Sequence, residues 1–236
     1  MINFIQNITK KNKHLDQFAR FIGLYTYTKY KNYKRNKVLL NYGREVLVDF
    51  DKACQEGDKE YWLEFGTLLG AIREQNFISN DLDIDVGMYL EDYDSTHEQV
   101  LNKYGFIKSR YILIDDGRYG MEETYSKHGV DIDIFYFIRN KKNMYCHVFS
   151  NQNGLSYLAT LEQYGGLIVR EFSFPNMQTK KIGFLGSQFS IPNNYHEHLE
   201  ANYGNYMIKD KNFSYKKTKN QTIKMGKIGK VIENEI

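Results

Sequence analysis

Residues 62–88 read WLEFGTLLGAIREQNFISNDLDIDVGM, and the rest of the chain is organised around this stretch. Its pattern predicts a short strand, a small-residue turn that opens a helix over residues 67–74, and a second strand over residues 81–88. Aspartates and apolar residues alternate along the second strand, and successive strand side chains point to opposite faces. One face of this strand is therefore expected to carry the carboxylates of Asp81, Asp83 and Asp85.

The carboxylates and the turn before them predict one site. Carboxylates crowded on one face repel each other unless a cation lies among them, and a hard divalent cation bound by oxygen atoms meets that need. The turn has the sequence GTLLG, in which glycine lets a ligand approach the backbone and the helix start offers free N–H groups to an anion. We expect Gly66, Thr67 and Gly70 to bind phosphate, an arrangement suited to phosphoryl or nucleotidyl transfer.

Arg73 follows the turn on the same predicted helix, about two turns from its start. Two interpretations of this residue remain open. Its guanidinium contacts the bound phosphate, or it forms an ion pair with one of the aspartates.

A second pair of acids stands in residues 129–137, GVDIDIFYF. Acids in so apolar a strand are costly without a partner. The apolar run after them favours a buried strand over an exposed edge strand. If this strand lies beside the first, Asp133 completes the site as a metal ligand or as a proton acceptor, and Asp131 is a further acid.

Composition limits the class of protein. The 236 residues suffice for one large domain, and 42% of them are hydrophobic, which allows a substantial core. Cys54 and Cys146 show no pairing or metal-type spacing, which favours a reducing compartment. No signal-peptide core and no run of 18 apolar residues is present, so we expect a cytoplasmic protein.

The net charge of +3 hides two basic ends. Residues 1–40 hold nine Lys and Arg and one acid, and residues 208–236 hold eight Lys and three acids, which leaves a net charge of −10 between them. An acidic centre fits a metal-loaded site. The basic ends would attract the inner membrane surface, a lipid-linked acceptor or a nucleotide, or they simply form a solvated surface.

Three segments are expected along the chain. Residues 1–37 form a basic helical segment, in which residues 1–20 either contact a membrane surface or cap the core. Residues 38–207 form the catalytic domain and open with an amphipathic helix over residues 38–57. Residues 208–236 have little apolar periodicity and are expected to be a loosely folded or mobile basic tail.

The motif set resembles the signature of the LicD family, whose relatives include fukutin and the fukutin-related protein. The Gly-Thr-Leu-Leu-Gly turn, Arg73 and the three alternating aspartates match it, and Asp133-Ile134-Phe135 matches the family's later Val-Asp-Ile-Phe-like strand. Two later elements also match, namely Lys181–Gly186 and the Pro-x-x-Tyr…Leu…Tyr-Gly segment that runs from Pro192 to Gly204. The resemblance spans residues 38–207. Ser79-Asn80 departs from the family's Pro-Trp before the aspartates.

The resemblance implies an α/β (α+β) fold: a nucleotidyltransferase-like mixed sheet with flanking helices and a C-terminal embellishment. It implies transfer of a substituted phosphate, such as phosphocholine, from CDP-choline, CDP-ribitol or CDP-glycerol to a hydroxyl of a cell-surface glycan such as lipopolysaccharide, teichoic acid or capsule. Mg²⁺ or Mn²⁺ would be held by Asp83 and Asp85 with Asp81 and Asp133, and Arg73 would stabilise phosphate charge.

Three alternatives remain. The first is a nucleotidyltransferase that moves the NMP itself onto a protein or small molecule, which would release pyrophosphate instead of CMP. The second is a catalytically silent nucleotide- or glycan-binding protein, although all the acids of the metal site are present. The third, a nucleic-acid-binding protein, is disfavoured by the acidic centre and the lack of a readout motif.

Overall fold

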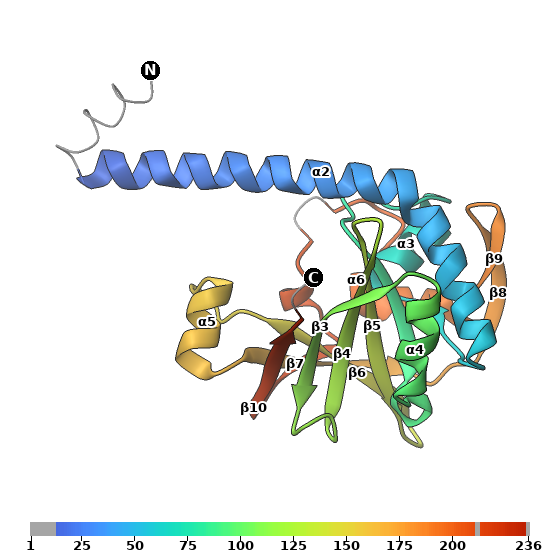
Figure 1. The fold of residues 1–236 in the computed structure, drawn as a ribbon. Coiled ribbons are helices and arrows are strands. Elements are labelled where there is room, and N and C mark those ends of the chain that lie inside the picture. The colour runs from blue at the N-terminus through green and yellow to red at the C-terminus, as the bar shows by residue number, and fades with distance from the viewer. Residues whose placement is uncertain (1–12, 211–212, 235–236) are drawn as a thin grey trace.

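The computed structural model describes residues 13–210 and 213–234. Its first element is the long helix α2 (Lys13–Glu56), which crosses above the sheet in Figure 1 and then bends down along it. The helix runs unbroken through residue 37, so the segment boundary predicted there is not a structural break. Most of the helix predicted over residues 1–20 lies outside the described residues.

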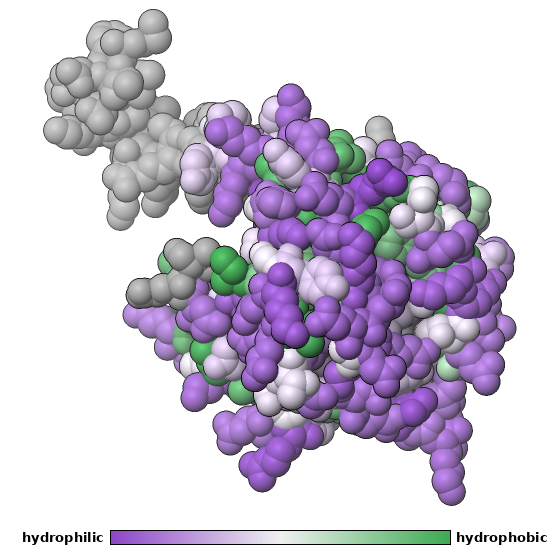
Figure 2. All heavy atoms as spheres, turned by 45° about the vertical axis from the view of Figure 1, so that its right-hand side comes forward, coloured by the Kyte–Doolittle hydropathy of each residue, from purple (hydrophilic) through white to green (hydrophobic). Residues whose placement is uncertain are grey.

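The surface in Figure 2 is mostly hydrophilic, with apolar side chains scattered among polar ones. On α2, three tyrosines one turn apart are exposed, namely Tyr27, Tyr30 and Tyr33. In the described part of the chain, no helix is both long and apolar enough to cross a lipid bilayer.

The centre of the fold is an eight-stranded mixed sheet in the order β1-β2-β5-β4-β3-β10-β7-β6, which confirms the predicted α+β class. The strands are β1 (Trp62–Leu63), β2 (Ile84–Tyr89), β3 (Ile107–Ile114), β4 (Gly120–Lys127), β5 (Val130–Arg139), β6 (Asn143–Ser150), β7 (Leu167–Pro175) and β10 (Gln221–Glu233). The β2–β5 pair is parallel, whereas the other neighbours are antiparallel. The end of β5 also pairs with β6, so six of the strands close into a ring.

Shorter elements cover the sheet and its rim. A separate hairpin pairs β8 (Thr179–Phe184) with β9 (Ser187–Pro192). The short helices are α3 (Phe65–Arg73), α4 (Thr96–Lys103), α5 (Tyr157–Tyr164) and α6 (Tyr195–Tyr203), with 3-10 turns η1 (Leu90–Asp92) and η2 (Tyr215–Lys217). The helix α3 agrees with the helix predicted over residues 67–74 to within two residues at either end.

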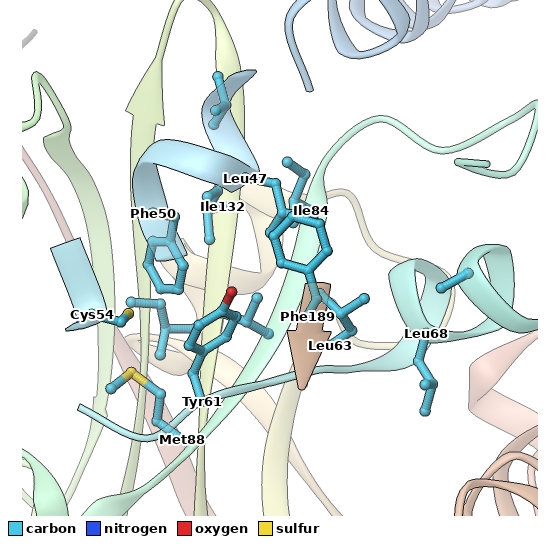
Figure 3. Close-up of a cluster of buried hydrophobic side chains, with 14 of the residues drawn as sticks. Leu47, Phe50, Cys54, Tyr61, Leu63, Leu68, Ile84, Met88, Ile132 and Phe189 are labelled. Carbon is cyan, nitrogen blue, oxygen red and sulfur yellow. The ribbon is translucent and has the colours of Figure 1, made fainter. Parts of the chain in front are cut away.

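The core lies between the C-terminal half of α2 and the sheet. Figure 3 shows Leu47 and Phe50 of α2 facing Ile84 of β2 and Ile132 of β5. The Phe50 ring meets Tyr61 edge to face, with ring centroids 5.1 Å apart. Each fully buried side chain of this size stabilises the fold by roughly 1.5–3 kcal/mol. The amphipathic helix predicted over residues 38–57 therefore fixes one face of the two acid-bearing strands.

The expected loose tail is wrong, because β10 lies inside the sheet between β3 and β7. Most of its side chains are exposed or half-buried, so the strand has little hydrophobic periodicity to reveal it. Its backbone pairs with both neighbours, and the pairing register with β7 shifts between Ile223 and Ile228. Main-chain hydrogen bonds, which any sequence supplies, hold this strand in place.

Candidate active site

The two acid-bearing segments meet side by side, as the sequence predicted. Strands β2 and β5 are parallel, and their register places Asp85 directly opposite Asp133. Successive carboxylates on either strand share one face. Asp81 and Asp83 lie just before β2, which begins at Ile84 and not at residue 81. Three acids therefore lie just before or at the start of β2, and Asp131 and Asp133 lie at the start of β5, so the two strands bring five acids together.

Asp85 is held by the first turn of α3. The Gly66 N–H donates to Asp85 Oδ2 (3.0 Å), and the Asp85 N–H donates to Thr67 Oγ1 (2.8 Å). The helix starts at Phe65, so both residues lie within it and not in a turn before it. A Cβ on Gly66 would come within 3.0 Å of Asp81 Oδ1, which explains a glycine here. These contacts orient the carboxylate, and the phosphate role of the two residues stays a prediction.

Gly70 and Arg73, also predicted to bind phosphate, have other contacts in the structure. A Cβ on Gly70 would lie 2.6 Å from the Asn76 carbonyl oxygen, so this glycine admits the following loop. Arg73 pairs with Glu74 (3.0 Å) and donates to the Tyr206 carbonyl (3.0 Å). Arg73 therefore forms its ion pair with Glu74 and not with one of the aspartates, which was the second interpretation of this residue. Arg73 does line a cavity of about 470 Å³ that Asp81 also borders.

Two arginines that the sequence analysis missed flank the acids. Arg35 of α2 donates to Asp131 Oδ2 (3.1 Å) and lies 3.6 Å from Asp83 Oδ2. Arg110 of β3 lies 3.8 Å from Asp133 Oδ1. In the sequence, Arg35 stands among lysines and Arg110 in an ordinary hairpin strand. Nothing in the local pattern distinguishes either residue, and only the tertiary structure brings them here.

The register across three strands explains the position of Arg110. Arg110 of β3 pairs with Thr124 of β4, and Thr124 pairs with Asp133 of β5. The Thr124 hydroxyl donates to Asp133 Oδ1 (2.5 Å), and Arg110 donates to Thr124 Oγ1 (3.1 Å) and to Glu122 (3.1 Å). Both arginines line a polar cavity of about 340 Å³ together with Asp83, Asp131 and Asp133. This cavity therefore has cationic walls around acidic groups, which suits a phosphate bound with a cation.

Burial and mutual repulsion raise the pKa values of these acids. Burial, and next the charge of Asp83, raise the pKa of Asp81 to about 7. Burial and the charge of Asp133 raise the pKa of Asp83 to about 7. The pKa of Asp85 rises well above its ordinary value because of burial and three acidic neighbours, and burial also raises that of Asp133. Perturbed acids that share a cleft are typical of functional sites.

The donor set suits a hard cation, although the carboxylates do not converge as placed. Over residues 13–210 and 213–234, no three acidic, histidine or cysteine side chains are arranged as a metal site. The buried Oδ2 atom of Asp81 has no hydrogen-bond partner, and the neighbouring carboxylates repel each other. Oxygen-only donors of this kind bind Mg²⁺ or Mn²⁺ in preference to softer metals. The residues present therefore fit a divalent cation.

Comparisons with known proteins match the part of the chain that contains these acids. A family model described as LicD/FKTN/FKRP, nucleotidyltransferase domain, matches residues 58–194. The ribitol-5-phosphate transferase FKTN of Homo sapiens is 26% identical over 163 residues, which cover 68% of this chain and 32% of that protein. The ribitol 5-phosphate transferase FKRP of Homo sapiens is 30% identical over 157 residues, covering 64% and 28%.

A bacterial relative is also similar. An uncharacterised protein of Rickettsia typhi is 27% identical over 153 residues, which cover 61% of this chain and 44% of that protein. The chain spans less than a third of the length of either human transferase. The matched region of the family model contains both acid-bearing segments and the α3 turn. Because that model covers more than half of the sequence, the chain belongs to the LicD/FKTN/FKRP family, whose nucleotidyltransferase domain it carries.

Proposed function

We propose that this protein transfers a substituted phosphate from a CDP-activated alcohol to a hydroxyl of a cell-surface glycan. The observation that carries the proposal is the in-register pair of Asp85 and Asp133 in a chain of the LicD/FKTN/FKRP family, with Asp85 bonded to the first turn of α3. Two relatives named as ribitol-phosphate transferases support the reaction class. The donor alcohol, with choline, ribitol and glycerol as candidates, and the acceptor glycan are parts of the same proposal.

A divalent cation, Mg²⁺ or Mn²⁺, belongs to this proposal. Asp83 and Asp85 would hold it, with Asp81 and Asp133 as further ligands. When bound, such a cation offsets the negative charge on the pyrophosphate and on the departing CMP. The raised pKa values of the acids support this assignment, because a cation among them removes the repulsion that burial strengthens.

The chain's own side chains supply the remaining chemistry. The acceptor hydroxyl oxygen attacks the phosphorus of the alcohol phosphate, and the bond from that phosphorus to the CMP oxygen breaks. Asp133 is positioned either to take the hydroxyl proton or to act as a metal ligand, and its raised pKa favours proton uptake. Arg35 and Arg110 line the polar cavity and would orient the phosphates, with Arg73 on the neighbouring cavity.

The basic part of α2 supports a location beside an anionic membrane surface. Lys34 lies over the Tyr30 ring (4.7 Å) and Lys37 over the Tyr33 ring (4.9 Å), both on α2. Exposed tyrosine and lysine together suit a lipid–water interface. Two free, buried cysteines support a reducing compartment, so we place the protein at the cytoplasmic side of the membrane.

The test is a panel of CDP-choline, CDP-ribitol and CDP-glycerol incubated with Mg²⁺ and candidate glycans. Release of CMP together with transfer of the alcohol phosphate to one glycan is the expected result. Release of pyrophosphate from a nucleoside triphosphate, with the NMP attached to a protein or small molecule, would replace the proposal by the nucleotidyltransferase alternative. Nucleotide binding without turnover under any condition would favour the silent binding protein.

A further inference from the structure

A second cavity, of about 260 Å³, lies beside the acids and has an aromatic wall. Asp81 and Asp85 border it, so it opens onto the same carboxylates as the proposed reaction centre. Its aromatic lining comes from α3, β5, β7, α6 and the segment at residues 213–215, and consists of Phe65, Phe135, Phe172, Tyr203, Phe213 and Tyr215. Pockets that take a whole small-molecule ligand measure roughly 300–1,000 Å³, so a cavity of this size suits one ring of a larger ligand.

The aromatic wall is rigid on its inner side. Phe65 has a φ of +39°, a left-handed backbone that a bulky residue rarely adopts, and its ring meets Phe135 edge to face with centroids 4.7 Å apart. The Phe65 ring also lies edge to face with Phe172, at 6.0 Å. The outer rim is more open, because Phe213 and Tyr215 are partly exposed. Rings of this kind offer flat faces and edges to a planar ligand.

One polar side chain in this cavity lacks a partner. Asn202 of α6 lines the cavity and is only 5% exposed, and its Oδ1 atom has no hydrogen-bond partner. Leaving a buried amide oxygen without a hydrogen-bond donor is costly, and native proteins rarely do so without a functional reason. A ligand that enters the cavity with an N–H group would supply the missing donor.

We propose that this cavity binds the nucleobase of the donor and that Asn202 selects cytosine. The single pyrimidine ring packs against the aromatic wall, and its exocyclic amino group donates to Asn202 Oδ1. Uracil carries a carbonyl oxygen at the same ring position, which would place two acceptors face to face. The proposal rests on the nucleotide donor of the proposed function. Because Asp81 and Asp85 border the cavity, a base held there leaves its phosphates next to the carboxylates.

Isothermal titration of the full chain with CDP and UDP, in buffer containing Mg²⁺, tests this assignment. CDP is expected to bind at least about tenfold more tightly than UDP, because UDP leaves a buried acceptor unsatisfied. Asn202→Ala should weaken CDP binding to within about twofold of UDP binding. The matched control is Asn205→Ala, an exposed asparagine just beyond the same helix, which should keep the wild-type preference.

The outcomes separate the two proposals. Equal affinity of the wild-type protein for CDP and UDP, or a full CDP preference in Asn202→Ala, would overturn the role of Asn202 and leave the proposed function standing. Failure of the wild-type protein to bind any of these nucleotides would instead contradict the proposed function. If Asn202→Ala does not fold, a CDP analogue without the 4-amino group replaces the variant, and it should lose about tenfold in affinity relative to CDP.

Discussion

Asp85 and Asp133 stand opposite each other in the adjacent parallel strands β2 and β5. One is fixed by the Gly66 N–H and the other by the Thr124 hydroxyl. The two carboxylates are thus oriented by different neighbours and cannot separate without breaking the sheet. This pairing makes the acids of two distant segments a single electrostatic unit, and the following predictions depend on it.

Replacing Asp83 by asparagine should lower turnover by at least about a hundredfold. The change removes a charge that the proposed cation needs and keeps the side-chain shape. CMP release from the preferred CDP-alcohol measures it. Asp116→Asn, in the exposed turn between β3 and β4, is the matched control and should retain activity. An Asp83→Asn protein that turned over at the wild-type rate under saturating Mg²⁺ would remove Asp83 from the site.

The same substitution should raise the stability of the metal-free protein at alkaline pH. The pKa of Asp83 is about 7 in the folded protein and about 3.9 in an unfolded chain. Between these values the folded state binds more protons, so this group's contribution to stability falls as pH rises through the window. In EDTA, the Tm advantage of Asp83→Asn over wild type should therefore grow from pH 5 to pH 8, as thermal denaturation would measure.

A divalent cation should reverse this effect in the wild-type protein. Adding Mg²⁺ should raise the wild-type Tm more at pH 8 than at pH 5, because protonated carboxylates bind the cation weakly. Equal stabilisation at both pH values, or equal stabilisation of wild type and Asp83→Asn, would argue against a cation at these acids.

Replacing Arg35 by methionine should reduce catalytic efficiency by roughly tenfold. The change removes the cation that contacts Asp131 and lies near Asp83, and it keeps much of the aliphatic length. The positive charge of Arg35 lowers the pKa of Asp83. Removing that charge should raise this pKa and move the acidic limb of the pH–rate profile to higher pH. Lys31→Met, an exposed cation on the same helix, should change neither quantity. An unshifted pH profile in Arg35→Met would contradict the electrostatic role.

Adding a methyl group at Gly66 should disturb the site more than the fold. A Cβ there would meet Asp81 Oδ1 at 3.0 Å and Asp85 Oδ2 at 3.2 Å. We expect Gly66→Ala to lose about 1–3 kcal/mol of stability and a larger share of its activity, since both carboxylates must move. Gly183→Ala, where the nearest atom lies at 3.6 Å, should behave as wild type in Tm and in CMP release. Unchanged activity in Gly66→Ala would show that the crowding is relieved without cost.

The local elements and the acidic character of the site can be predicted from the amino-acid sequence. Alternation in LDIDVGM and VDIDIFYF fixes which side chains share a face, because strand geometry has a period of two. The apolar period of residues 38–57 likewise places one helix face on the core. The prediction that the two acid strands are neighbours was confirmed, because buried acids need partners and few arrangements supply them.

The identity of the residues around those acids depends on how distant parts of the chain pack together. Arg35 and Arg110 reach the site through helix packing and a three-strand register, and Asn202 faces the aromatic cavity through α6. The C-terminal strand β10 enters the sheet by main-chain pairing and not by burial of an apolar face. Every residue type except proline offers the same backbone donor and acceptor, so a sequence pattern encodes the period of a strand but not the partner beside which it lies.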